Sequence, residues 1–333
     1  MSALLGNAYV VLQRLKSSTT GRRDITRVQD TMVGHLAVAD SLMGVYMLVI
    51  ASADVYYRDR YAFFAEAWQT SYICKLAGFL SVLSSEASVL FMTVISIDRC
   101  LGMLFPFSDL KLRPKSAKIA AALVWIFISI ISLLPVMVKS YFGDAFYGRS
   151  TVCLALPLTA ERPAGWEYSV AIFIGFNLVA FLTMLICYSA IYYIAKSSSS
   201  QVGRVSDARM KEIQLAMRMA FLVLTDACCW MPIIIIGILS LTNTVTIPGI
   251  TYAWTAVFIL PLNSSLNPYL YTLASRGIKK RSSSNSRTAS SMQSIKRGGG
   301  DYEDYSVNDV QKYNAAYTPD SEAGLTQQES KCK

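Results

Sequence analysis

The segment "AKIAAALVWIFISIISLLPVMV" (residues 117–138) contains one charged side chain, Lys118, among its 22 residues. The hydrocarbon core of a bilayer is about 30 Å thick, and a helix needs roughly 20 apolar residues to cross it. A segment this long and this apolar therefore predicts a transmembrane helix.

Similar apolar runs recur along the chain, and none has the alternating pattern of a barrel strand. Only helices and closed barrels satisfy the backbone within lipid, so these runs favour helices. Hydrophobic residues make up 53% of the chain and charged residues only 16%, which agrees with a membrane protein. We expect an all-α integral-membrane bundle with six full spans, near residues 31–53, 72–104, 117–138, 167–195, 213–241 and 250–273.

Residues 1–15, "MSALLGNAYVVLQRL", form a shorter apolar segment. As a helix they would reach about 22 Å, which is less than the bilayer core. A signal peptide is the alternative, but no basic residue precedes the apolar part. Arg14 and Lys16 follow it instead, as they would at the cytoplasmic exit of a span. We therefore expect a seven-transmembrane bundle whose first helix is truncated.

The connections between spans alternate in charge. Every second connection is basic, whereas residues 54–71 are mixed and residues 242–249 carry no charge. The positive-inside rule places the basic connections, and with them the C-terminus, in the cytoplasm. This orientation accounts for much of the net charge of +9, so nucleic-acid binding is not needed to explain it. The basic residues are Arg22, Arg23, Arg27, Lys111, Arg113, Lys115, Lys118, Lys196, Arg204, Arg209 and Lys211, followed by residues 276–281.

Residues 282–333 differ in composition from the rest of the chain. They begin with a serine-rich stretch and continue with acidic and polar residues and few large aliphatic ones. Such a segment cannot bury a core, so we expect a disordered cytoplasmic tail with candidate phosphorylation sites. Residues 16–281 then hold the remaining spans, their loops and a short amphipathic helix.

Cysteine positions predict one disulfide. Cys74 and Cys153 are the only two of the seven cysteines that this topology places in an oxidising space. His35 is the single histidine, and no spaced Cys/His pairs occur, which argues against a zinc or haem site. We expect His35 to pack between helices and no catalytic residue set to be present.

Polar side chains within the apolar runs are candidates for function. Charged groups at membrane depth are costly and tend to face the bundle interior. Asp40, Glu86 and Asp226 are such groups. The alternative is a polar network that only holds helices together. Neutral polar residues accompany the carboxylates, namely Ser88, Asn177, Asn263, Ser264 and Asn267.

Several motifs, taken in order, resemble the rhodopsin-like G-protein-coupled receptors over about residues 4–281. They are "GN" (6–7), "LAVAD" (36–40), Cys74, "DRC" (98–100), Trp125, "CWMP" (229–232) and "NPYLY" (267–271). Further details resemble the leucine-rich-repeat-containing group and, within it, the relaxin receptors. These are Glu86 in "SSEASVLFMTVISIDR" (84–99), Ala180 in place of a proline, and Asp226 where most receptors have phenylalanine. No repeat of 20–29 residues recurs, so we expect the family's hormone-capturing ectodomain to be missing here.

The resemblance implies roles for individual residues. Asp40, Ser88, Asn263, Ser264 and Asn267 match an internal sodium pocket, and oxygen ligands suit this hard cation.

Arg99, beside Asp98, matches the arginine held in the resting state by an acid on the sixth helix, here Glu212. A surface ion pair is the alternative for Glu212. Trp230 and Pro232 match the toggle and kink of the sixth helix, and Tyr188 and Tyr271 match tyrosines that move inward on activation.

Three residues depart from the family pattern: Cys100 replaces a tyrosine, and Gly277 and Ile278 stand where the amphipathic helix usually has an aromatic residue. No cysteine follows that helix directly for palmitoylation. We also expect Asp226 to hydrogen-bond Asn263 and Asn267 and so to hold the resting state.

The expected function is that of a plasma-membrane receptor rather than an enzyme. It would transmit a relaxin-like peptide or glycoprotein-type hormone signal to a heterotrimeric G protein, with arrestin and receptor kinases as candidate partners of the tail and lipid around the bundle. One alternative is an ion-coupled transporter that uses Asp40, Glu86 and Asp226, although internal repeats and paired broken helices are not visible. A truncated non-signalling receptor variant is another alternative.

Overall fold

The computed structural model describes residues 1–18, 24–105, 108, 110–155, 162–200, 207–242, 244, 248, 251, 254–259 and 261–270. These residues are almost entirely helical and include no strand. The helices are α1 (Ser2–Ser18), α2 (Asp24–Tyr57), α3 (Tyr61–Thr70), α4 (Tyr72–Leu104), α5 (Pro114–Met137), α6 (Lys139–Phe142), η1 (Tyr147–Arg149), α7 (Trp166–Ser169), η2 (Val170–Phe176), α8 (Asn177–Ser200), α9 (Asp207–Leu241) and η3 (Thr255–Ile259). Residues 261–270 are also helical.

Five of the described helical segments are long and apolar enough to cross a bilayer. They confirm five of the six predicted spans, and the sixth, near residues 250–273, lies partly outside the described residues. The segments are Thr26–Tyr57, Tyr72–Leu104, Pro114–Met137, Trp166–Ser197 and Ile213–Leu241. The predicted tail, residues 282–333, and the positions Gly277 and Ile278 lie outside the described residues as well.

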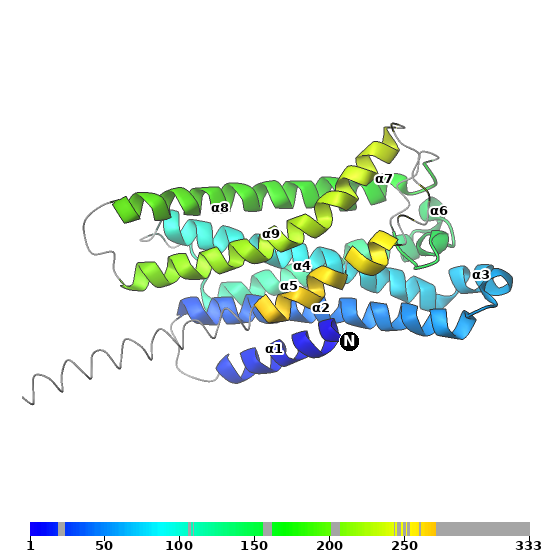
Figure 1. Cartoon of the computed structure of the whole chain (residues 1–333), viewed down its shortest axis with the longest axis horizontal. Coiled ribbons are helices and arrows are strands. Elements are labelled where there is room, and N and C mark those ends of the chain that lie inside the picture. Colours follow the sequence, from blue (N-terminus) through cyan, green and yellow to red (C-terminus); the bar gives the residue numbers. More distant parts are fainter. Residues whose placement is uncertain are drawn as a thin grey trace, which may run out of the picture. The chain divides into compact units, whose positions relative to one another are not determined.

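Helix α4 is the central element of the bundle and contacts α2, α5, α8 and α9. Figure 1 shows these helices running alongside one another. About 72% of the apolar window of α4 is buried within the protein, compared with 28% for α5, which keeps most of its apolar surface for lipid. Small side chains on α4 let its neighbours approach closely. They include Ala77, Gly78, Ser81, Ser84, Ser85, Ala87 and Ser88.

Helix α1 packs against α2 and is tied to it near the start of α2, where Val28 and Arg99 line the same small cavity. Arg14 of α1 and Asp30 of α2 form an ion pair at 2.5 Å. Farther along α1, the Asn7 amide donates to the carbonyl oxygen of Ser264 at 2.8 Å. The α1 segment is thus joined to α2 and to the helix at residues 261–270, and it extends three residues past the predicted end at residue 15.

The opposite end of the bundle, here called the disulfide end, contains the predicted Cys74–Cys153 bond. The sequence predicted a loop over residues 54–71, but α2 continues to Tyr57 and α3 occupies most of the rest. Asp59 makes the turn between them with φ of 62°, a conformation that aspartate tolerates better than most residues. The indole of Trp68 anchors α3 by donating to the carbonyl oxygen of Thr151 at 2.9 Å.

His35 is a packing residue, as predicted. The Trp125 indole on α5 donates to His35 Nδ1 at 3.2 Å, and the imidazole stacks on Phe91 of α4 with ring centroids 5.6 Å apart. One side chain on α2 therefore joins α4 and α5. Within the described part of the chain, no group of three or more histidine, cysteine or acidic side chains is arranged to hold a metal ion.

Gly78→Ala should destabilise the protein, because a Cβ atom at this position would overlap the Tyr147 ring. Overpacking of this kind typically costs about 1–3 kcal/mol. Gly34→Ala on α2 is the matched control, since nothing lies within 4 Å of its added Cβ. Thermal unfolding in detergent checks the difference, and equal midpoints for the two variants would show that the contact with Tyr147 is wrong.

Loss of the Cys74–Cys153 bond should lower the unfolding midpoint. The bond closes a sequence separation of 79 residues, and removing a disulfide typically costs about 2–5 kcal/mol. Cys74→Ala tests this, with Cys228→Ala as the control because Cys228 is free and exposed. A Cys74→Ala midpoint equal to that of Cys228→Ala would contradict the expected role of the bond.

Candidate functional site

A buried polar network lies in the centre of the bundle. Asp40 on α2 accepts a hydrogen bond from the Ser88 hydroxyl on α4 at 3.2 Å and another from the Asn267 amide at 2.8 Å. All three side chains are buried. Three members of the predicted sodium set, taken from three different helices, are therefore brought together around one carboxyl group.

Ser264 is a fourth member, because its side chain also interacts with Asp40 while its carbonyl oxygen accepts from Asn7. Asn263 is placed differently, since its amide donates to Asp226 on α9. The predicted hydrogen bond between Asp226 and Asn263 is present. The predicted hydrogen bond between Asp226 and Asn267 is wrong, because the Asn267 amide donates to Asp40.

A third buried carboxyl group, Glu86 on α4, contacts the first residue of α8. The Asn177 amide donates to Glu86 Oε1 at 3.3 Å. The same amide lies 3.3 Å from the carbonyl oxygen of Ile172 and 3.5 Å from that of Phe173. The sequence indicates that Glu86 and Asn177 are polar residues at membrane depth, but it does not indicate that they contact each other.

The π-helix η2 explains why the Asn177 amide finds two carbonyl oxygens. A π-helical turn contains one more residue than an α-helical turn, and such turns occur frequently at functional sites. Neither η2 nor α8 contains a proline, and Ala180 lies in the first turn of α8, so the distortion of these turns does not depend on proline. The Asn177 side chain fills the widened turn and directs its other contact toward α4.

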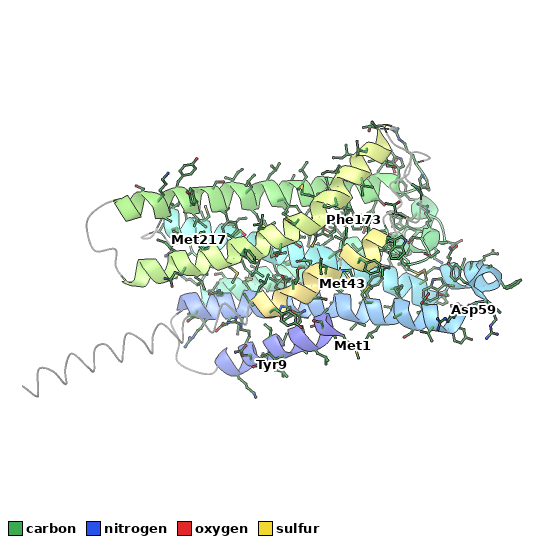
Figure 2. All side chains as sticks on the ribbon, viewed as in Figure 1. Met1, Tyr9, Met43, Asp59, Phe173 and Met217 are labelled. Atoms are coloured by element: carbon green, nitrogen blue, oxygen red, sulfur yellow. A yellow bond between two sulfur atoms is a disulfide. The ribbon has the colours of Figure 1, made fainter. Side chains whose placement is uncertain are left out.

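One turn from Asn177 toward the disulfide end, Phe173 of η2 stacks on Trp230 of α9. Their ring centroids are 6.2 Å apart, and Figure 2 labels Phe173 on the segment that precedes α8. Pro232 lies two residues beyond Trp230, inside α9, and Figure 1 shows that α9 changes direction along its length. A proline inside a helix removes a backbone hydrogen bond, which accounts for a bend.

At the other end of α4, Arg99 is paired with its neighbour in sequence. Its guanidinium donates to Asp98 Oδ2 at 2.6 Å, and the backbone N–H of Leu112 donates to Asp98 Oδ1 at 2.9 Å. A cavity of about 20 Å³ adjoins the pair, with Gly102 and Lys111 in its lining. Asp98 therefore fixes Arg99 and the connection after α4 at the same time.

The remaining predicted switch residues are only partly described. The Tyr188 hydroxyl lies 3.3 Å from the Ser96 hydroxyl, one turn before Arg99 and Cys100. Glu212 lies within α9, but its side chain is outside the described part of the chain, and Tyr271 is outside it entirely. The predicted contact between Arg99 and Glu212 thus stays a prediction. Cys100 packs in a small apolar cluster with Met103, Cys187, Ile191 and Ala216.

Comparison with known proteins connects this arrangement to a family. The model of the "7 transmembrane receptor (rhodopsin family)" matches residues 6–271. The chain belongs to this family. A seven-helix membrane bundle is therefore its fold, and the resemblance predicted from the motifs is confirmed.

Individual relatives point to the same branch. The chain is 42% identical over 272 residues to "G-protein coupled receptor GRL101" of Lymnaea stagnalis, covering 82% of this chain and 24% of that protein. It is 36% identical over 279 residues to "Relaxin receptor 2" of Canis lupus familiaris, covering 83% and 37% respectively. "Thyrotropin receptor" of the same species is 32% identical over 279 residues, covering 84% and 34%. The chain is thus relaxin-receptor-like and spans only about a quarter to a third of the length of these curated relatives.

Asn177→Ala should destabilise the bundle, because it removes the donor to Glu86 and to the two η2 carbonyl oxygens. A buried polar group left unsatisfied costs about 1–3 kcal/mol. The control is Thr183→Ala on the same helix, where the lost bond is exposed and internal to α8. Thermal unfolding should show a clearly larger decrease for Asn177→Ala, and similar midpoints would contradict the described contact.

Proposed function

We propose that this chain carries the transmembrane part of a receptor that passes the signal of a peptide or glycoprotein hormone to a heterotrimeric G protein. The family supports a receptor, and its relatives include a relaxin receptor and a thyrotropin receptor. The observation that carries the proposal is the buried contact between Asp226 on α9 and Asn263 on the last described helix. This contact joins two helices at a depth where a lost partner is costly.

In the proposed orientation, the disulfide end faces the extracellular side and the Arg99 end faces the cytoplasm. A disulfide forms and persists in an oxidising compartment. The connection after α4 contains Lys111 and Arg113, and α5 begins with Lys115 and Lys118, which the positive-inside rule favours in the cytoplasm. A cytoplasmic C-terminus belongs to the same proposal.

In the proposed mechanism, α9 is the moving element. Pro232 weakens the helix between its two halves, so the cytoplasmic half can pivot while the outer half stays packed. The contact between Asp226 and Asn263 opposes this movement. A hormone drives the change only by favouring the state in which the contact is released. Movement of α9 away from α4 would then expose Arg99 to the G protein.

A sodium ion at Asp40 is a further proposal within this function. The chemistry of the site fits a hard cation, because Asp40 supplies two carboxylate oxygens and Ser88 a hydroxyl. Asn267 Oδ1 is buried and has no hydrogen-bond partner among the described residues, so it is available as another oxygen ligand. Sodium would supply a positive charge that balances Asp40.

The candidate partners of the tail, arrestin and receptor kinases, also remain proposals, since residues 282–333 lie outside the described part. The family favours a receptor over an ion-coupled transporter, because the matched relatives named here are receptors.

A nucleotide-exchange assay tests the proposed function. The chain in lipid nanodiscs should accelerate GDP release from heterotrimers of at least one α-subunit class, relative to empty nanodiscs. Arg99→Ala should remove the acceleration, whereas Ile119→Ala, on the lipid-facing side of α5, should not. No acceleration by the wild-type chain or by Asp226→Asn, across all α-subunit classes, would overturn the proposal.

Asp226→Asn should raise basal exchange, because it weakens the buried hydrogen bond that ties α9 to Asn263. Such bonds contribute about 0.5–1.5 kcal/mol, so an increase of about two- to tenfold is expected. Thr225→Ala is the neighbouring control, since its hydroxyl bonds only to Leu222 within α9. Unchanged basal exchange by folded Asp226→Asn protein in nanodiscs would show that Asp226 has a structural role alone.

A further inference from the structure

Three buried carboxyl groups in the bundle have no basic partner among the described residues. Asp40, Glu86 and Asp226 are each fully buried. In the same buried set, Arg99 is the one basic side chain, and it is paired with Asp98 at the end of α4. Isolated charges at this depth are too costly to leave uncompensated, so something else must balance them.

Helix geometry brings Glu86, Asn177 and Asp226 into one layer. Phe173 of η2 stacks on Trp230 of α9. Asn177 comes four residues after Phe173, and Asp226 comes four residues before Trp230, so each lies about one turn from the stack on the same helix face. The two segments run in opposite directions, which places both residues on the same side of the stack and opposite each other.

Two contacts complete this layer. Glu86 reaches it through its bond with Asn177, and Asn263 reaches it through its bond with Asp226. The charges of Glu86 and Asp226 are also close enough to interact. The layer therefore combines side chains from α4, α8, α9 and the helix at residues 261–270, beneath the Phe173–Trp230 stack.

Each of these four side chains has one oxygen without a partner in the described structure. The atoms are Glu86 Oε2, Asn177 Oδ1, Asp226 Oδ2 and Asn263 Oδ1. The amide orientation of Asn177 is fixed, because its nitrogen faces the Ile172 and Phe173 carbonyl oxygens. All four unpaired atoms are acceptors, so the layer lacks a donor or a cation.

We propose that Glu86, Asn177, Asp226 and Asn263 form a second internal cation site, separate from the one at Asp40. Its ligand is a small hard monovalent cation, either Na⁺ coordinated by these oxygen atoms or a proton bound by one of the two carboxyl groups. Ca²⁺ takes about 6–8 oxygen ligands, and Mg²⁺ keeps several waters, which four oxygens in a buried layer do not accommodate. Asp40 is assigned to the first site because both of its oxygens have hydrogen-bond donors, whereas each of these four residues has an oxygen without one in the described structure.

A cation there would join four helices through one charge. It would balance one of the two negative charges of the Glu86–Asp226 pair, and it would reduce the repulsion between them. The titratable groups around Glu86 are Asp226 on α9, Tyr168 on α7 and, beyond Asp226, Asp40 on α2. A change of the unfolding midpoint with pH must therefore be assigned to one of these groups by substituting each of them in turn.

The test measures thermal unfolding of the whole chain in nanodiscs. Na⁺ replaces N-methylglucamine at constant ionic strength, at about pH 6 and about pH 9, on either side of neutrality. An Asp40→Asn background removes the first site. In that background, Na⁺ or acid should still raise the midpoint by about 2–4 °C. Adding Glu86→Gln should abolish this shift, whereas adding Glu66→Gln, at an exposed position on α3, should not.

The outcomes separate the two cations. A shift with Na⁺ that Glu86→Gln abolishes identifies sodium, and a shift with pH alone that Glu86→Gln abolishes identifies the proton. The absence of both shifts in the Asp40→Asn background, or their survival in Glu86→Gln, overturns the proposal.

Infrared difference spectroscopy covers the case in which Asp40→Asn does not fold, because it needs only the single variant Glu86→Gln. A Na⁺-sensitive carboxylate band or a protonated-carboxyl band that disappears in Glu86→Gln supports the site. The absence of any such band overturns it.

Discussion

A carboxyl group within the hydrocarbon layer needs a partner there, because water cannot solvate it and an unbalanced charge is costly. In this chain, Asp226 meets the requirement through Asn263, Asp40 through Ser88 and Asn267, and Glu86 through Asn177. Each contact crosses between helices, so the positions of α2, α4, α8 and α9 are coupled through polar groups as well as through apolar packing.

The helix distortions lie close to these contacts. The π-helix η2 directly precedes Asn177, and Pro232 follows Asp226 by less than two turns. Distorted turns expose backbone groups or loosen the helix, and neighbouring side chains compensate for this. The segments that can change shape are therefore the same segments that the buried polar contacts hold.

Much of this fold could be predicted from the sequence, because apolar length and loop charge are local properties. Five spans agree with the apolar runs, and the disulfide followed from the topology of two cysteines. The polar pairings were harder to predict, since they depend on how each helix is rotated about its axis. Asn267 was expected to contact Asp226 and instead contacts Asp40, and Glu86 was not paired with Asn177 at all. Helix α3 was missed because it lies within residues 54–71, whose mixed charge led to their interpretation as a loop.

Asp226 and Asn263 are expected to stabilise the bundle as a pair. A double-mutant cycle with Asp226→Ala, Asn263→Ala and the double variant, measured by equilibrium unfolding in lipid, tests it most directly. Neutral hydrogen bonds between membrane helices average about 0.6 kcal/mol. A buried carboxyl contact should give a coupling energy of at least about 1 kcal/mol. Additive effects of the two single changes would contradict the claim.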